Sequence, residues 1–211
     1  MRREFHVRFC EGGGVRFPSA TRRNIYVRSQ RAGQRVITRI TQFITLRLKL
    51  KVNETKSAVA RPWDRKFLGF SFTNGREPKR RIAPKARQRF KARVRELTRR
   101  TRGVSLQVMV NQLTEYLRGW RSYFGSCQTP SVLRDLESWV RRRLRCVQWK
   151  QWKRGKRRFA ELRKLGVGKD LAAQTAGSSH GPWRISRSPA LSFALPDAFF
   201  AKLGLPSLSV R

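Results

Sequence analysis

Aromatic side chains alternate with arginine and lysine at two places in the second half of the sequence. The first run extends from Arg118 to Phe124, and the second from Trp149 to Arg154. Aromatic rings stack on bases and neighbouring cations bind phosphates, so this mixture is typical of RNA-binding surfaces. The candidate RNA-binding residues in these runs are Arg118, Arg121, Trp149, Lys150, Trp152, Lys153 and Arg154.

The aromatic residues of the two runs differ in their helical position. Trp120 and Phe124 continue the apolar face of a predicted helix, so their spacing also fits a place in the core. Trp149 and Trp152 fall off the main apolar face of the following helix. This position favours base stacking for the second pair, although a core role stays open for both.

Two further patterns consist of basic residues alone. Arg87, Lys91 and Arg95 recur every four residues and form a basic stripe beside an apolar one. A dense basic turn follows later in the sequence and contains Arg141, Arg142, Arg143 and Arg145. We predict that it binds phosphate, and the alternative is a solvated face. Arginine forms bidentate contacts with phosphate, which suits this role.

The composition points to a polyanionic partner. The 211 residues carry 50 Lys and Arg against 12 Asp and Glu, a formal net charge of +38. Such a chain repels itself unless a polyanion neutralises it, and nucleic acid is the commonest polyanion in cells. Most of this charge lies in residues 76–169, which hold 29 basic and 6 acidic residues.

Residues that could support catalysis are scarce. His6 and His180 have no partner at metal-ligand or triad spacing, and no pair of acidic residues is placed to bind two metal ions. Three scattered cysteines form no C-x-x-C pair, which indicates a reducing, cytoplasmic setting and no metal site. No stretch is apolar enough to span a bilayer. Residue chemistry alone therefore predicts a binding protein without a cofactor.

The first part of the chain is expected to mix strands and a helix. Residues 1–23 contain three consecutive glycines and Pro18, which predicts an irregular segment. Alternating or apolar runs predict strands at 24–28, 48–52 and 66–73, and a 3.6-residue period predicts a helix at 34–47.

Beyond Arg76 the pattern becomes helical. One amphipathic helix is expected to begin at Pro84, a second after Ser105 and a third after Thr129, forming a bundle. The third helix is expected to bury Trp139 with its apolar neighbours. A basic helix follows at 156–164, and the tail from Gly166 is expected to be partly irregular. The fold class is thus α+β, a small mixed part followed by a mainly α-helical bundle.

Three stretches together resemble one known family. YLRGWRSYFG at 116–125 resembles the signature of the maturase (X, or thumb) domain of group II intron reverse transcriptases. KFLGFSFT at 66–73 resembles the strand after the palm, and LKLKVNETKSAV at 48–59 resembles the motif before it. The three segments occur in the family's order, and two later runs, at 149–155 and 166–172, are similar to bacterial members.

The resemblance implies a division of the chain into four parts. Residues 1–23 would be a degenerate start and 24–75 a remnant of the reverse-transcriptase palm. Residues 76–165 would be the maturase-specific helical domain, and 166–211 a tail that contacts DNA or RNA. The implied partner is group II intron RNA, bound to assist splicing, with target DNA as a further candidate.

The family's polymerase chemistry is not expected from this chain by itself. Family members hold two Mg²⁺ ions with the Asp pair of a Tyr-Ala-Asp-Asp turn, which here is replaced by Pro18–Arg23. No acidic residue stands between Glu11 and Asn24, and the rest of the palm and fingers is expected to be missing before Met1. Lys56 matches a family palm lysine but cannot act alone.

Three alternatives stay open at this stage. A second polypeptide could supply the palm and complete an RNA-directed DNA polymerase. The chain could be a non-specific basic RNA-binding protein. It could also be a pseudogene product that does not fold, since residues 1–23 look broken. The sequence identifies neither the intron nor the oligomeric state.

Overall fold

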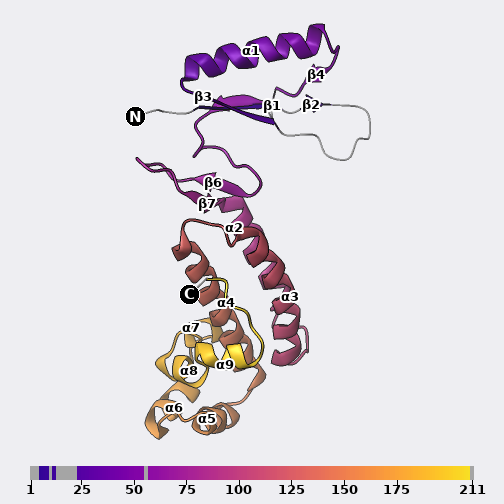
Figure 1. Cartoon of the computed structure of the whole chain (residues 1–211). Coiled ribbons are helices and arrows are strands. Elements are labelled where there is room, and N and C mark those ends of the chain that lie inside the picture. Colours follow the sequence, from indigo (N-terminus) through magenta and orange to yellow (C-terminus); the bar gives the residue numbers. More distant parts are fainter. Residues whose placement is uncertain (1–4, 10, 13–22, 55–56, 210–211) are drawn as a thin grey trace. The chain divides into compact units, whose positions relative to one another are not determined.

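The computed structural model describes residues 5–9, 11–12, 23–54 and 57–209, and for residues before Asn24 it describes the backbone alone. The chain divides into two compact units, Met1–Ala83 and Pro84–Arg211 (Figure 1). The division falls just before the proline that begins the first helix of the second unit.

An antiparallel sheet and one helix form the centre of the first unit. Strand β1 (Phe5–Phe9) lies between β3 (Arg23–Val27) and β5 (Ala58–Ala60). The register pairs Phe5 with Val27 and Val7 with Val59. Helix α1 (Gln30–Leu46) packs along these strands, and Ser29 caps its start by accepting a hydrogen bond from the Ala32 N–H at 3.1 Å.

Two short strand pairs complete the first unit. Strand β2 (Glu11–Gly12) pairs with β4 (Lys51–Val52), and β6 (Phe70–Phe72) pairs with β7 (Arg80–Ile82), both antiparallel. The hairpin loop after β6 is closed by the Lys79 N–H, which donates to the Thr73 hydroxyl at 2.8 Å.

The predictions for the first unit are confirmed in part. The strand at 24–28 and the helix at 34–47 are present, as β3 and α1. The irregular segment expected at 1–23 is wrong for β1 and β2, because Phe5-His-Val-Arg-Phe9 alternates with the period of a strand. The remainder of 1–23 lies outside the described residues.

Two predicted strands are shorter than expected. Only Lys51–Val52 of 48–52 is extended, because Lys49 has a positive φ of 50° that interrupts the strand. Within 66–73, Leu68 (φ 48°) and Gly69 (φ 80°) form a tight turn, and the Phe67 and Phe70 backbones bond to each other across it. The turn leaves Phe70–Phe72 as the strand.

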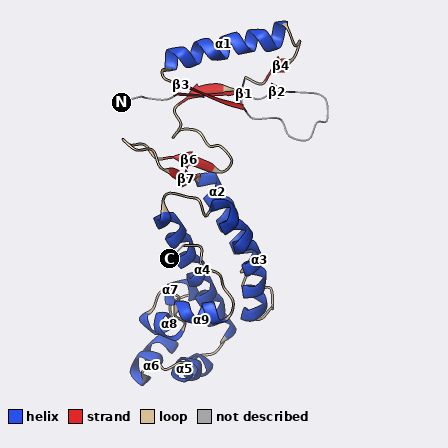
Figure 2. Cartoon of the chain, viewed as in Figure 1, coloured by secondary structure: helices blue, strands red, loops and turns tan. Residues whose placement is uncertain are grey.

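In the second unit, the described residues form helices joined by loops, without a strand (Figure 2). Its first four helices are α2 (Pro84–Leu97), α3 (Leu106–Phe124), α4 (Pro130–Gln151) and α5 (Gly155–Lys164). These confirm the helices expected from Pro84, Ser105, Thr129 and 156–164. Their facing sides bury apolar residues at helical spacing, including Phe90, Leu113 and Leu144.

The expected helix starts differ in how they are capped. The Ser105 hydroxyl accepts a hydrogen bond from the Val108 N–H at 3.3 Å, and Gly103 before it has a φ of 69° that favours glycine. Thr129 precedes a helix with proline at its first position but makes no cap hydrogen bond. Its hydroxyl instead lies 3.1 Å from the Cys127 sulfur.

The C-terminal segment contains four short helices separated by non-helical turns, so the expectation of a partly irregular tail is confirmed. They are α6 (Lys169–Ala176), α7 (Pro182–Ile185), α8 (Pro189–Ala194) and α9 (Asp197–Lys202). Several of its glycines, prolines and serines stand at helix starts, as Ser188-Pro189 does. Leu191, Leu195 and Phe200 are fully buried. No helix in the described part of the chain is long and apolar enough to cross a membrane.

Candidate nucleic-acid interface

A partly exposed tryptophan lies among three cations where α2 faces α4. The ring centroid of Trp139 is 5.6 Å from the Lys91 ammonium nitrogen, 5.6 Å from the Arg95 guanidinium carbon and 5.5 Å from that of Arg143. These distances are those of cation–π contacts. The ring keeps part of its surface open to solvent.

Helical periodicity explains how the four residues meet. Lys91 and Arg95 are one turn apart on α2, and Trp139 and Arg143 are one turn apart on α4. The basic stripe predicted on α2 therefore lies against an aromatic-basic pair on α4. Sequence reasoning assigned Trp139 to the core, because it adjoins the apolar face, and so missed it as a surface residue.

Arg143 is fixed in position before any ligand binds. Its Nε donates to the Thr98 hydroxyl at 2.7 Å and its Nη2 to the Thr98 carbonyl at 3.3 Å. Burial lowers the pKa of Arg143 below its ordinary value, and the nearby charges of Arg95 and Arg100 lower it further. These like charges repel one another, and an anion would relieve the repulsion.

Two cavities adjoin the cluster around Trp139, one at each end. One of about 240 Å³ is lined by Arg100, Arg143 and Trp183, among others. Trp183 is 40% exposed, and the Arg142 guanidinium stacks 3.8 Å from its ring centroid. We call this surface the α2–α4 basic face, and it comprises Lys91, Arg95, Arg100, Trp139, Arg142, Arg143 and Trp183.

At the other end, a cavity of about 300 Å³ is lined by Arg87, Lys91 and Asp135, among others. The Nε of Arg87 is buried and finds no hydrogen-bond partner in the described part of the chain. All three members of the predicted stripe thus lie along the line between α2 and α4. Asp135 is an acidic residue in this otherwise basic stretch.

The arrangement of the α2–α4 basic face can bind a base and a phosphate together. The partly exposed indole of Trp139 offers a stacking surface, and base–aromatic stacking is worth about 1–3 kcal/mol per base. The surrounding guanidinium groups can contact the phosphates on either side of that base. No ion pair among the described residues involves Lys91, Arg95 or Arg143.

Trp149 and Trp152, predicted to stack on RNA, are buried instead. Their side chains are 1% and 3% exposed, and their rings meet edge to face with centroids 6.0 Å apart. The Arg158 guanidinium of α5 covers Trp149 at 4.6 Å. The expectation that these indoles lie off the core is wrong because α5–α9 add a second core on that side of α4. Trp120 and Phe124, each 8% exposed, are core residues.

Two arginines of the predicted phosphate-binding turn have intramolecular partners. Arg141 pairs with buried Glu137 and, at 3.0 Å, with Asp197. Arg145 donates to the Leu195 carbonyl at 2.9 Å and lies 3.7 Å from Asp197. Both side chains therefore attach α4 to the C-terminal helices, and the phosphate role predicted for them stays a prediction. Arg142 and Arg143 belong to the α2–α4 basic face.

The remaining predicted residues lie on other surfaces. Arg118 is exposed on α3 and Arg121 partly so, and three basic residues around the end of α4 are exposed, namely Lys150, Lys153 and Arg154. The structure does not bring either group onto the α2–α4 basic face. Lys56 lies outside the described residues. Within the described ranges, no three His, Cys, Asp or Glu residues gather as metal ligands.

Part of the second unit is similar to a known family. Residues 87–166 match the family model of the group II intron, maturase-specific domain. The match extends from α2 through α5, and so it contains Trp139 and its three cations. A search of curated protein sequences gave no match. The finding supports a group II intron maturase and agrees with the resemblance seen at 116–125.

Proposed function

We propose, from the maturase-specific domain at residues 87–166, that this protein binds group II intron RNA through the α2–α4 basic face and assists intron splicing. The observation that carries the proposal is the partly exposed Trp139 among Lys91, Arg95 and Arg143. It supplies base stacking and phosphate contact at one place. The family match supplies the class of RNA.

In this proposal the first unit is a remnant of a reverse-transcriptase palm. Its sequence resemblance covers 48–59 and 66–73, and its sheet with α1 is compatible with part of a palm. No acidic residue occupies 12–23, where the family's metal-binding turn would stand. We therefore propose that the chain contributes RNA binding and not nucleotidyl transfer. Target DNA is a second proposed partner, without a surface assigned to it.

The test compares two RNAs across a salt titration, using the full chain. A structured group II intron RNA is measured against a control RNA of equal length, for the wild type and for Trp139→Ala. Affinity for both RNAs falls steeply with salt because phosphate contacts release counterions. We expect the intron RNA to keep an advantage of about tenfold or more, about 1.4 kcal/mol, as salt rises.

The variants distinguish this proposal from non-specific RNA binding by a basic protein. Trp139→Ala is expected to lower intron affinity by roughly fivefold or more, since one stacked base contributes about 1–3 kcal/mol. Arg134→Gln is the control, because Arg134 is exposed on α4, about 140° around the helix from Trp139. Equal binding of both RNAs at every salt concentration would assign the chain to the non-specific RNA-binding class instead.

A further inference from the structure

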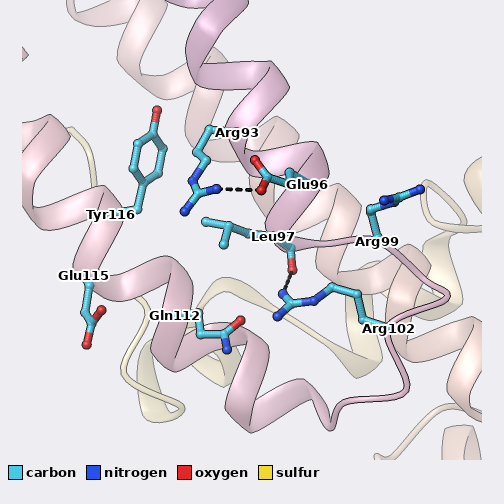
Figure 3. Close-up of a pocket in the computed structure, with 8 residues that line it drawn as sticks. All are labelled: Arg93, Glu96, Leu97, Arg99, Arg102, Gln112, Glu115 and Tyr116. Atoms are coloured by element: carbon cyan, nitrogen blue, oxygen red, sulfur yellow. Dashed lines mark hydrogen bonds and ion pairs between the residues drawn. The ribbon is translucent and has the colours of Figure 1, made fainter.

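A polar pocket lies between α2 and α3, away from the α2–α4 basic face. Its volume is about 680 Å³, within the range of small-molecule sites. Figure 3 shows Arg93 and Leu97 of α2 opposite Gln112 and Tyr116 of α3, with Arg102 near the lower edge. Arg99, Glu96 and Glu115 complete the lining.

The pocket and the basic face occupy opposite flanks of α2. Arg93 is two positions from both Lys91 and Arg95, and a step of two positions along an α-helix turns by about 200° around its axis. A ligand in the pocket would therefore leave Trp139 free for its own contact.

The groups around the pocket are held in place, and one polar atom is left unsatisfied. Arg93 pairs with Glu96 at 2.7 Å, and Arg102 donates to the Leu97 carbonyl at 2.8 Å. The Gln112 Oε1 is buried and accepts no hydrogen bond within the described part of the chain. An unsatisfied buried acceptor costs free energy, and a ligand donor would remove this cost.

Tyr116 supplies a ring at one side of the pocket. Its ring packs against Phe90 with centroids 5.8 Å apart, which fixes its orientation. Burial raises the pKa of the Tyr116 hydroxyl, while nearby Arg93 and Arg89 act to lower it. The ring is thus neutral and partly dehydrated at physiological pH, as a stacking surface should be.

The mixture of groups narrows the chemical class of ligand. Glu96 and Glu115 would repel a ligand that consists of phosphate groups alone. The polar lining, in turn, does not suit an apolar molecule. A nucleotide offers a planar base, edge donors and acceptors, and one phosphate. The Gln112 amide matches the donor and acceptor edge of adenine, the ring of Tyr116 matches its face, and Arg102 can meet the phosphate.

We propose that this pocket receives a single unpaired nucleotide of the bound RNA, with adenosine the preferred base. The inference rests on the proposed RNA-binding function and adds a second contact to it. The domain would then engage RNA on both flanks of α2, one contact through Trp139 and one through Gln112 and Tyr116. Such paired contacts can fix the path of an RNA strand around the helix.

The experiment uses the full chain and two short RNA duplexes that differ by one bulged adenosine. We expect the wild type to bind the bulged duplex at least about fivefold more tightly, from stacking of one base. Gln112→Leu and Tyr116→Leu should abolish this preference while leaving affinity for the perfect duplex unchanged. Tyr123→Leu is the matched control, because Tyr123 is 51% exposed on the same helix.

The outcomes separate the two proposals. A bulge preference that is absent, or that survives Gln112→Leu, overturns the pocket assignment while the perfect duplex still binds. Failure of the RNA-binding proposal would appear instead as loss of the intron preference. Tyr116→Leu also removes the ring contact with Phe90. If this variant misfolds, Gln112→Leu alone tests the pocket assignment. Adenosine 5′-monophosphate is titrated without RNA, and micromolar binding would assign the pocket to free nucleotides and overturn the RNA assignment.

Discussion

The carboxylate of Glu137 accepts a hydrogen bond from the hydroxyl of Ser209 at 2.9 Å, across 72 residues of sequence. Glu137 is 4% exposed and its other oxygen pairs with Arg141 on the next turn of α4. The end of the described chain is thereby attached to the middle of the longest helix. The family match ends at residue 166, yet the compact unit continues beyond it to this contact.

Removing this carboxylate should destabilise the second unit. We expect Glu137→Ala to lower the free energy of unfolding by about 1–3 kcal/mol, because Ser209 and part of Arg141 lose a buried partner. Urea denaturation of the full chain measures the change. Ser138→Ala, at an exposed neighbouring position, should leave the midpoint unaltered. Equal stability of both variants would show that the contact adds nothing to folding.

Truncating Trp149 should affect folding before it affects RNA binding. The side chain is 1% exposed, so Trp149→Ala leaves a large cavity and should cost about 3–5 kcal/mol. Lys150→Ala, one residue later and exposed, should change stability little. Thermal unfolding followed by circular dichroism distinguishes them. A stable Trp149→Ala protein with weakened RNA affinity would restore the stacking role predicted from the sequence.

Neutralising the stripe on α2 should change the salt dependence of RNA binding. The double variant Lys91→Gln, Arg95→Gln removes up to two phosphate contacts, so the slope of log affinity against log salt should become shallower by roughly 1–2. Filter binding between low and high salt gives this slope. Arg134→Gln should keep the wild-type slope. An unchanged slope in the double variant would place the phosphates elsewhere on the protein.

The two described cysteines should differ in reactivity. Burial raises the pKa of the Cys146 thiol, although nearby Arg100 and Arg143 oppose this, whereas Cys127 is partly exposed. At pH 8 less thiolate forms at Cys146, so its alkylation should be slower by roughly tenfold or more. Mass spectrometry of a Cys10→Ser variant follows both sites. Similar rates at Cys127 and Cys146 would contradict the burial.

The same shift predicts a pH dependence of stability. The unfolded thiol ionises at a lower pH than the folded one, so the free energy of unfolding should fall as pH rises above the ordinary thiol pKa. Cys146→Ser should reduce this fall relative to the wild type. Denaturant midpoints at several alkaline pH values measure the difference.

The helices of the second unit could be predicted from local sequence, whereas several strands could not. Each helix carries a 3.6-residue apolar period and a start signal such as Ser105 or Thr129-Pro130. Strand β7 at Arg80–Ile82 has no such signal, because its pairing with β6 depends on a hairpin loop rather than on its own residues. Non-local pairing leaves little trace in a short strand.

The candidate interface could be predicted only on its α2 side. The stripe of Arg87, Lys91 and Arg95 is visible in the sequence, because its members share one helix. Trp139 was missed because its position on α4 borders the apolar face, and only the α2–α4 contact decides how much of the ring is covered. The role of an arginine also depends on its tertiary partners, which Asp197 supplies for Arg141.

Two arginines of α4 are held in place by hydrogen bonds, which has a consequence for the RNA binding that we propose. Arg143 is held by Thr98, and Arg142 by the Trp183 carbonyl at 3.0 Å, before any partner arrives. Their rotamer freedom is therefore lost during folding and not during complex formation, which removes an entropic penalty from association. In the proposed complex, two guanidinium groups at fixed positions would favour RNA whose phosphates are spaced to match them, so binding would depend on RNA shape.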